Sequence, residues 1–239
     1  MQIQAILFDL GNTLAKSGSF IEAYHRLETM PHIQAMGLDR EALLNISSEI
    51  DKILRALYQK DVCTQPHWFD VWQAAVVNSG ITLTDDQITE LCYAHLEAFL
   101  QDCPVEPFAI PLLTTLKEHN IPLGLISNVT GPLELHAANF QRKGLAEFFD
   151  VTAWSNAIGI RKPDPIIFQF ALDELKLPAS KQILMVGDNE TADIQGGNAM
   201  GFTTLKVIDN ESEEESAADY VVKKEDLIDF FNSIFFLAG

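Results

Sequence analysis

The segment Ile3–Leu14, which reads IQAILFDLGNTL, decides the fold of this chain. Its apolar run Ile3–Phe8 has the length and composition of a strand that is buried on both faces, as in a parallel sheet. Asp9 follows at the end of this predicted strand. Open parallel sheets bind ligands beyond the carboxyl ends of their strands, so Asp9 is the first candidate functional residue. An aspartate here also suits a turn or a helix cap, and further segments must decide between these roles.

The rest of the chain predicts an α/β fold with a parallel sheet. Four more apolar runs are expected to be strands, namely Leu123–Ile126, Ile183–Val186, Thr203–Val207 and Tyr220–Val222. Patterns of helical periodicity between them predict helices at Leu112–His119, Pro165–Leu175 and Asp193–Met200. Strands that alternate with helices in this way are typical of βαβ units.

Residues 17–103 follow a different pattern. They contain almost no strand signal, and the helices predicted in them include Arg40–Leu57, His67–Val77 and Thr84–Leu100. Thr84 and Gln87 have the spacing of a capping box at the start of the third of these helices. We therefore expect a helical segment, residues 17–103, inserted into an α/β core that is made of residues 1–16 and 104–239.

The composition of the 239-residue chain limits its partners. Apolar residues make up 47% of it, enough for a large core, and the formal net charge is −18. A surface this acidic disfavours binding to nucleic acids and to anionic membranes. The N-terminal apolar run does not fit a signal peptide, and the stretch Phe230–Leu237 is far shorter than the roughly 20 residues of a membrane-spanning helix. Three widely spaced cysteines, Cys63, Cys92 and Cys103, fit free thiols rather than a zinc site, so we expect a cytoplasmic protein.

The segment Val186–Asp193 reads VGDNETAD and combines a predicted strand end with two aspartates. This spacing places Asp188 and Asp193 near the tip of the sheet. Carboxylate oxygens are hard ligands of the kind that Mg²⁺ prefers, with several waters retained. Taken singly, Asp188 also fits a turn and Asp193 a helix cap. The pair at one strand end predicts a metal site.

Two further segments place polar residues at strand ends or in a rigid turn. Ser127 and Asn128 follow the second predicted strand, where a hydroxyl group can cap a helix or bind an anion beside its N-terminus. Residues 159–165, GIRKPDP, contain Lys162 immediately before a Pro-x-Pro turn that fixes its direction. An isolated lysine is normally solvated, and we expect the neighbouring Arg161 to point to solvent.

These four segments, in this order, resemble the four sequence motifs of the haloacid-dehalogenase-like (HAD) hydrolases that carry a helical cap. The resemblance covers Ile3–Thr13 and then roughly Val105 to the C-terminus. It implies a Rossmann-like, doubly wound parallel sheet with an inserted all-helical cap domain at residues 17–103. In this family the cap closes over the edge of the sheet and supplies substrate specificity.

The resemblance also implies roles for individual residues. Asp9 would be the catalytic nucleophile, and Lys162 would neutralise charge between it and a bound phosphate. The residues that would contact the phosphate are Ser127, Asn128 and Thr13. The implied cofactor is Mg²⁺, and its ligands would be Asp9, the carbonyl group of Gly11, Asp188 and Asp193.

Gly11 departs from the family pattern. Phosphatases of the family usually carry a second aspartate at this position, which acts as general acid and general base. Glycine has no side chain to hold a proton, although its carbonyl group can bind a metal as well as that of an aspartate. General acid–base catalysis is worth ~10²–10⁴-fold in rate. A residue of the predicted cap such as Glu22 or His25 would have to replace it, and nothing in the sequence selects one.

Three functions remain compatible with this sequence. The first is a Mg²⁺-dependent hydrolase of phosphorylated small molecules, a phosphatase that forms an aspartyl-phosphate on Asp9 and is slow or limited to good leaving groups. The second is a 2-haloacid dehalogenase, whose halide leaves without a proton, or a phosphonate C–P hydrolase. The third is a non-catalytic protein that keeps the fold and binds a metal or another ligand. No sequence feature indicates an oligomeric state.

Overall fold

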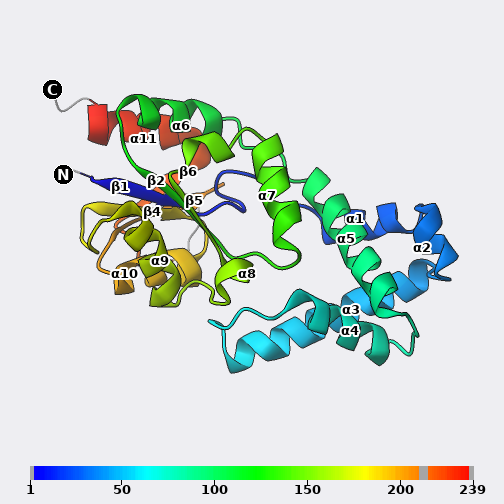
Figure 1. Cartoon of the computed structure of the whole chain (residues 1–239). Helices are drawn as coiled ribbons and strands as arrows, with labels where there is room; N and C mark the ends of the chain where they lie inside the picture. The colour runs from blue at the N-terminus through cyan, green and yellow to red at the C-terminus, as the bar shows by residue number, and fades with distance from the viewer. Residues whose placement is uncertain (1–2, 210–214, 237–239) are drawn as a thin grey trace.

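The computed structural model describes residues 3–209 and 215–236, which include a six-stranded parallel sheet (Figure 1). The strands are β1 (Ala5–Phe8), β2 (Leu123–Ser127), β3 (Val151–Trp154), β4 (Ile183–Gly187), β5 (Thr203–Ile208) and β6 (Tyr220–Lys223). Their order across the sheet is β3-β2-β1-β4-β5-β6, and each neighbouring pair is parallel. The chain starts in the middle of the sheet and winds outward in both directions, so the predicted doubly wound fold is confirmed.

Helices cover both faces of this sheet. Those outside residues 17–103 are α6 (Ala109–Glu118), α7 (Leu133–Arg142), α8 (Ser155–Ile158), α9 (Pro165–Leu175), α10 (Gly196–Ala199) and α11 (Leu227–Phe231). Ile6 and Phe8 of β1 pack with residues of α6 and α11, whereas Ala5 and Leu7 pack with residues of α9. Successive side chains of a strand point to opposite faces, so both faces of β1 are buried, and Figure 1 shows α6 and α11 opposite α9 and α10.

The segment predicted to be helical is helical. It contains α1 (Phe20–Leu27), α2 (Pro31–Ala35), α3 (Arg40–Lys60), α4 (Trp68–Asn78) and α5 (Asp85–Gln101). Their apolar faces form a buried cluster of their own, which includes Ile46, Trp72 and Leu91. The Thr84 hydroxyl accepts a hydrogen bond from the Gln87 N–H and the Gln87 side chain accepts one from the Thr84 N–H, so the capping box is confirmed. The division into a core and a cap domain at residues 17–103 stays a prediction.

The segment after β4 differs from the predicted helix Asp193–Met200. A π-helical turn, Glu190–Gln195, precedes α10. It begins early because the side chain of Asn189 accepts hydrogen bonds from the N–H groups of Thr191 and Ala192. Asn189 is therefore the cap of this helical turn, and Asp193 lies inside it.

Other differences lie at the edges of the fold. Strand β3 is an edge strand that was not predicted, because Thr152 interrupts its apolar run. Near the C-terminus, Phe231 is buried in the same cluster as Phe8 of β1, and Leu237 lies outside the described residues. Among the described residues, no helix has both the length and the apolar character to cross a membrane.

Candidate active site

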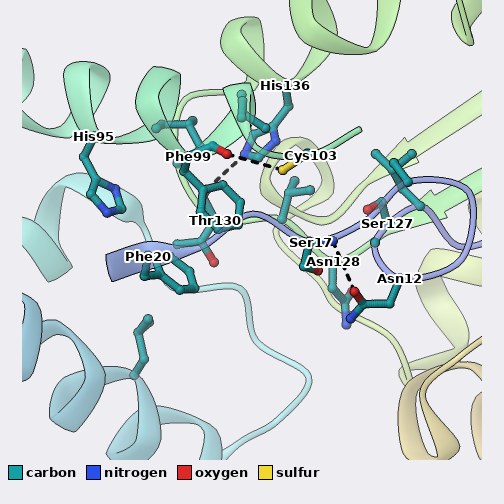
Figure 2. Close-up of a pocket in the computed structure, with 18 of the residues that line it drawn as sticks. Asn12, Ser17, Phe20, His95, Phe99, Cys103, Ser127, Asn128, Thr130 and His136 are labelled. Atoms are coloured by element: carbon teal, nitrogen blue, oxygen red, sulfur yellow. Dashed lines mark hydrogen bonds between the residues drawn. The ribbon is translucent and has the colours of Figure 1, made fainter. Parts of the chain in front are cut away.

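The candidate site lies at the carboxyl ends of three adjacent strands. Asp9 follows β1, Ser127 ends β2 and Asp188 follows β4, and β1 runs between the other two. The Asp9 N–H donates to the carbonyl oxygen of Val186 at 2.9 Å, which fixes the start of the loop after β1. These residues line a cavity of about 760 Å³ whose opposite wall comes from the helical segment (Figure 2). Parallel strands thus bring together residues that are far apart in sequence.

Lys162 is the buried cation of this site. Its side chain is 1% exposed, and its Nζ contacts Asp9 Oδ1 at 2.6 Å, Asp193 Oδ1 at 2.7 Å and the carbonyl oxygen of Ile126 at 2.6 Å. Burial alone lowers the pKa of Lys162, but the carboxylates of Asp193 and Asp9 outweigh it and hold the pKa above its ordinary value. Lys162 is therefore charged, and the alternative of a solvated surface lysine is wrong.

Asn128 holds the backbone of Lys162. Its Nδ2 donates to the Lys162 carbonyl at 2.9 Å, and its Oδ1 accepts from the Lys162 N–H at 2.9 Å. These two bonds give Asn128 a positioning contact with Lys162, and one N–H of its amide group is left for another partner, so its contact with phosphate stays a prediction. Ser127 is buried and lines the cavity, but it is no helix cap, because α7 begins only at Leu133.

Three carboxylates meet beside Lys162. One oxygen each from Asp9, Asp188 and Asp193 lies within 4.8 Å of the others. Burial, together with the charge of Asp9, raises the pKa of Asp188 to about 6. Asp193 is fully buried and accepts a hydrogen bond from the Asn189 N–H at 3.0 Å, and burial raises its pKa although Lys162 opposes the shift. The carboxylates outnumber the cation that they surround, so the cluster carries excess negative charge.

Gly187 makes this arrangement possible. A Cβ atom at this position would lie 2.3 Å from the side chain of Asp193. No side chain can occupy that space, so glycine is required where Asp193 folds back against the end of β4. The alternative of Asp193 as a simple helix cap is wrong, since Asn189 has that role.

Gly11 lines the cavity, whereas Thr13 does not. A Cβ atom added at Gly11 would lie 3.4 Å from Ser17 Oγ, an ordinary van der Waals contact. Thr13 is 1% exposed, and its hydroxyl has no hydrogen-bond partner in the described part of the chain. The predicted phosphate contact of Thr13 therefore finds no support in the geometry.

The two suggested replacements for the missing acid lie away from the site. Glu22 and His25 do not line the cavity; they lie 3.8 Å from each other, and Arg40 contacts His25 at 2.9 Å. Sequence reasoning missed further titratable side chains that line the cavity, among them Lys16, Tyr24, Asp51, His95, His136 and Lys143. Each comes from a helix or loop without a recognisable motif.

Arg161 does not point to open solvent, contrary to expectation. Its guanidinium group stacks on the ring of Tyr58 at 4.3 Å and donates to Gln65 Oε1 at 3.0 Å. Tyr58 and Gln65 belong to the helical segment, so their contact with Arg161 depends on how that segment lies on the sheet. The prediction failed because the sequence does not encode this placement in any local pattern.

Aromatic rings form the wall opposite the carboxylates. The ring of Phe20 stacks on Phe99 with centroids 4.6 Å apart, and it lies 5.8 Å from the ring of His95. Figure 2 shows these three residues on the side of the cavity away from Asn12 and Ser127. Burial lowers the pKa of His95 to about 4, so its ring is neutral at physiological pH.

Comparison with known proteins identifies the family. The model of the haloacid dehalogenase-like hydrolases matches residues 3–201. Ribulose-1,5-bisphosphate 5-phosphatase of Halopiger xanaduensis is 27% identical, over 90% of this chain and 88% of that protein. Glyceraldehyde 3-phosphate phosphatase of Methanocaldococcus jannaschii is 26% identical, over 97% of this chain and 98% of that protein.

Solved structures share the fold at lower identity. One is 2-haloacid dehalogenase from Pseudomonas syringae, with a TM-score of 0.70 and 22% identity, over 97% of this chain and 99% of that one. The family match extends over most of the chain and includes all four segments that build the site. The chain therefore belongs to the haloacid dehalogenase-like hydrolases.

Proposed function

We propose that this protein is a Mg²⁺-dependent hydrolase of phosphorylated small molecules with Asp9 as its nucleophile. The observation that carries the proposal is the cluster around buried Lys162, which contacts Asp9 and Asp193. The carboxylates of these two residues and of Asp188 lie within 4.8 Å of one another. A carboxylate held beside a fixed cation at a sheet edge is suited to attack an anionic phosphate ester.

The donor set fits Mg²⁺. Asp9, Asp188 and Asp193 offer hard oxygen atoms at one point, and their negative charge exceeds that of Lys162. Burial, together with the charge of Asp9, raises the pKa of Asp188, and a bound cation would oppose this shift. Mg²⁺ would be held by these carboxylates and the Gly11 carbonyl, and when bound it would neutralise charge on the phosphoryl oxygens.

The reaction follows from the position of Asp9. One oxygen of its carboxylate attacks phosphorus, the bond from phosphorus to the ester oxygen breaks, and the electron pair leaves with the ester oxygen. Water then attacks the phosphorus of the aspartyl-phosphate, which releases inorganic phosphate and regenerates Asp9. Lys162 holds the Asp9 carboxylate in place through its 2.6 Å contact and stabilises the charge that develops nearby.

Gly11 restricts the substrates of this reaction. It supplies no proton to the departing oxygen, and Glu22 and His25 lie off the cavity. The leaving group must therefore depart as an anion, which favours aryl and acyl phosphates over simple alkyl phosphates. The missing general acid is worth ~10²–10⁴-fold in rate for poor leaving groups.

Two observations favour phosphate over the alternatives. Both curated relatives described above are named phosphatases, and both match nearly the full chain. A halide leaves carbon without help from a divalent cation, so a dehalogenase would need Asp9 as nucleophile but no metal ligand, and the presence of Asp188 beside Asp9 counts against it. The dehalogenase structure with a TM-score of 0.70 shares the fold, and the experiment below includes its reaction.

An activity panel tests the proposal. Phenyl phosphate, acetyl phosphate and glycerol 3-phosphate are incubated with the native protein, with Mg²⁺ or with EDTA. We expect turnover of the first two only with Mg²⁺, and a loss of at least ~10⁴-fold in Asp9→Asn, because the nucleophile is removed. Asp70→Asn is the matched control, since that side chain is 78% exposed on α4.

Other outcomes would replace the proposal. Halide release from 2-chloropropionate without Mg²⁺ would assign a dehalogenase. Mg²⁺ binding without turnover of any phosphate ester, in both the native protein and Gly11→Asp, would assign a non-catalytic metal-binding protein.

A further inference from the structure

We propose that the exposed ring of Phe20 is a stacking platform for a planar aromatic leaving group, so that aryl phosphates are the preferred substrates. This inference rests on the proposed function and adds the substrate class. It concerns the wall of the cavity opposite Asp9, which the proposed chemistry does not otherwise use.

Phe20 is unusually exposed for a large aromatic side chain. It is 61% exposed, yet it lines the same cavity as Asp9 and lies on the wall formed by the helical segment (Figure 2). Isolated exposed hydrophobic residues are common on protein surfaces, and Phe170 on α9 is one, at 39%. What distinguishes Phe20 is that it lines the cavity of the candidate active site, whereas Phe170 does not.

The ring of Phe20 is held in place from behind. Phe99 stacks against it at 4.6 Å with an interplanar angle of 27°. Phe20 is also the first residue of α1, whose start is fixed by the Ser19 hydroxyl accepting a hydrogen bond from the Glu22 N–H at 3.2 Å. A preorganised ring binds a second ring without a large loss of side-chain entropy, which favours stacking with a ligand.

The surroundings of Phe20 favour an aromatic ring over a charged group. The ring of His95 stacks beside it, 5.8 Å from Phe20, 4.5 Å from Tyr24 and 5.2 Å from Trp72. The side chain of His95 is 7% exposed, so this cluster presents ring faces and no charge to the cavity. Neutral ring faces attract flat, polarisable groups and provide no ion pair for a phosphate or a carboxylate.

The same substrate class satisfies the chemistry at Gly11. When Asp9 attacks the phosphorus of an aryl phosphate, the phosphorus–oxygen bond breaks and the electron pair leaves on a stabilised phenolate, which takes a proton from solvent afterwards. The stacking platform binds the ring, and the acidity of the phenol replaces the general acid. Two independent features of the cavity thus point to one kind of leaving group.

A matched pair of esters separates stacking from leaving-group acidity. Phenyl phosphate is compared with hexafluoroisopropyl phosphate, whose alcohol is about as acidic as phenol but has no ring. We expect the native protein to favour phenyl phosphate in kcat/KM, and Phe20→Leu to lower kcat/KM for phenyl phosphate about five- to twentyfold while sparing the alkyl ester. Phe20→Tyr should keep the preference, and Phe170→Leu is the matched control.

Equal kcat/KM for the two esters in the native protein would overturn the inference. So would an equal loss on both esters in Phe20→Leu, because that result indicates a structural role. Thermal melting of each variant shows whether it is folded, and the exposure of Phe20 makes unfolding an unexpected result.

Binding of inert phosphonates keeps the inference testable if no ester is hydrolysed. Calorimetric titrations with phenylphosphonate and methylphosphonate, each with Mg²⁺, need no turnover. Phenylphosphonate that binds about fivefold more tightly, with the difference lost in Phe20→Leu, supports the platform even where the proposed hydrolysis fails. Equal affinities for the two phosphonates overturn it.

Discussion

The two ends of the cavity are built on opposite principles. At one end Lys162 is fully buried, and each of its contacts is to a carboxylate or a carbonyl oxygen within 2.7 Å. At the other end the exposed ring of Phe20 stacks on Phe99, and His95 has a buried Nε2 with no hydrogen-bond partner within residues 3–209 and 215–236. The cation at the charged end is surrounded by protein oxygen atoms, whereas the exposed ring of Phe20 at the aromatic end leaves surface for a ligand. The first is suited to chemistry and the second to selection.

The largest effect is expected when the charged end loses its cation. In Lys162→Met, Asp9 and Asp193 would face each other in a buried site without a positive charge. We expect the free energy of unfolding to fall by roughly 3–5 kcal/mol and phosphate turnover to be lost. Urea unfolding at neutral pH measures the first, and added Mg²⁺ should restore part of it, because the metal supplies the missing charge.

Lys181→Met is the matched control for this substitution. Lys181 contacts Asp219 at 3.1 Å, but its side chain is 61% exposed, so we expect a change of at most about 1 kcal/mol. A Lys162→Met variant that is as stable as the control would show that the folded protein holds the three carboxylates together without the positive charge of Lys162.

A second prediction adds a group to the charged end. Gly11 is not among the glycines with a positive φ, and a Cβ atom there meets only Ser17 Oγ, at 3.4 Å, so Gly11→Asp should fold normally. The new carboxyl group could protonate the leaving oxygen. We expect kcat for glycerol 3-phosphate to rise by ~10²-fold or more, with little change for acetyl phosphate, whose leaving group needs no proton.

Gly11→Asn is the control, because it adds a side chain of the same size without an acidic proton. The idea that Gly11 limits only proton transfer is lost if Asn produces the same gain as Asp. It is also lost if Gly11→Asp accelerates the acyl and alkyl substrates equally.

The charged end was largely predictable from sequence, because strands dictate it. Asp9, Ser127 and Asp188 each follow or end an apolar run, and a parallel sheet necessarily brings such ends to one edge. The details depend on local packing that no motif shows. The side chain of Asn128 bonds to the Lys162 backbone, and its predicted contact with phosphate stays a prediction, whereas Thr13 is buried and does not line the cavity.

The aromatic end was not predictable in the same way. Phe20, His95 and Phe99 occupy ordinary positions in amphipathic helices, where the same periodicity describes any core-facing residue. Their meeting at one cavity depends on how α1 and α5 pack and on where the helical segment lies over the sheet edge. The contact of Arg161 with Tyr58 has the same origin. Local patterns therefore predict the chemistry of a site better than its selectivity.

The smallest effect is expected at the aromatic end, in His95→Phe. His95 has its pKa lowered by burial to about 4, from an ordinary value of 6.5. As pH falls below 6.5 the unfolded chain takes up a proton that the folded protein accepts only near pH 4, so folding stability is lost over this window. At pH 5 the loss is roughly 2 kcal/mol, and Phe at this position removes it.

Thermal melts at pH 7 and pH 5 measure this difference. Any change in packing caused by the larger ring affects the stability at both pH values equally. The readout is therefore the loss of stability between pH 7 and pH 5, compared between the variant and the native protein. The variant should lose less stability than the native protein on acidification. An equal loss of stability in the two proteins would mean that His95 takes up a proton in the folded state as easily as in the unfolded chain. The aromatic end would then be more accessible to water than its ring contacts indicate.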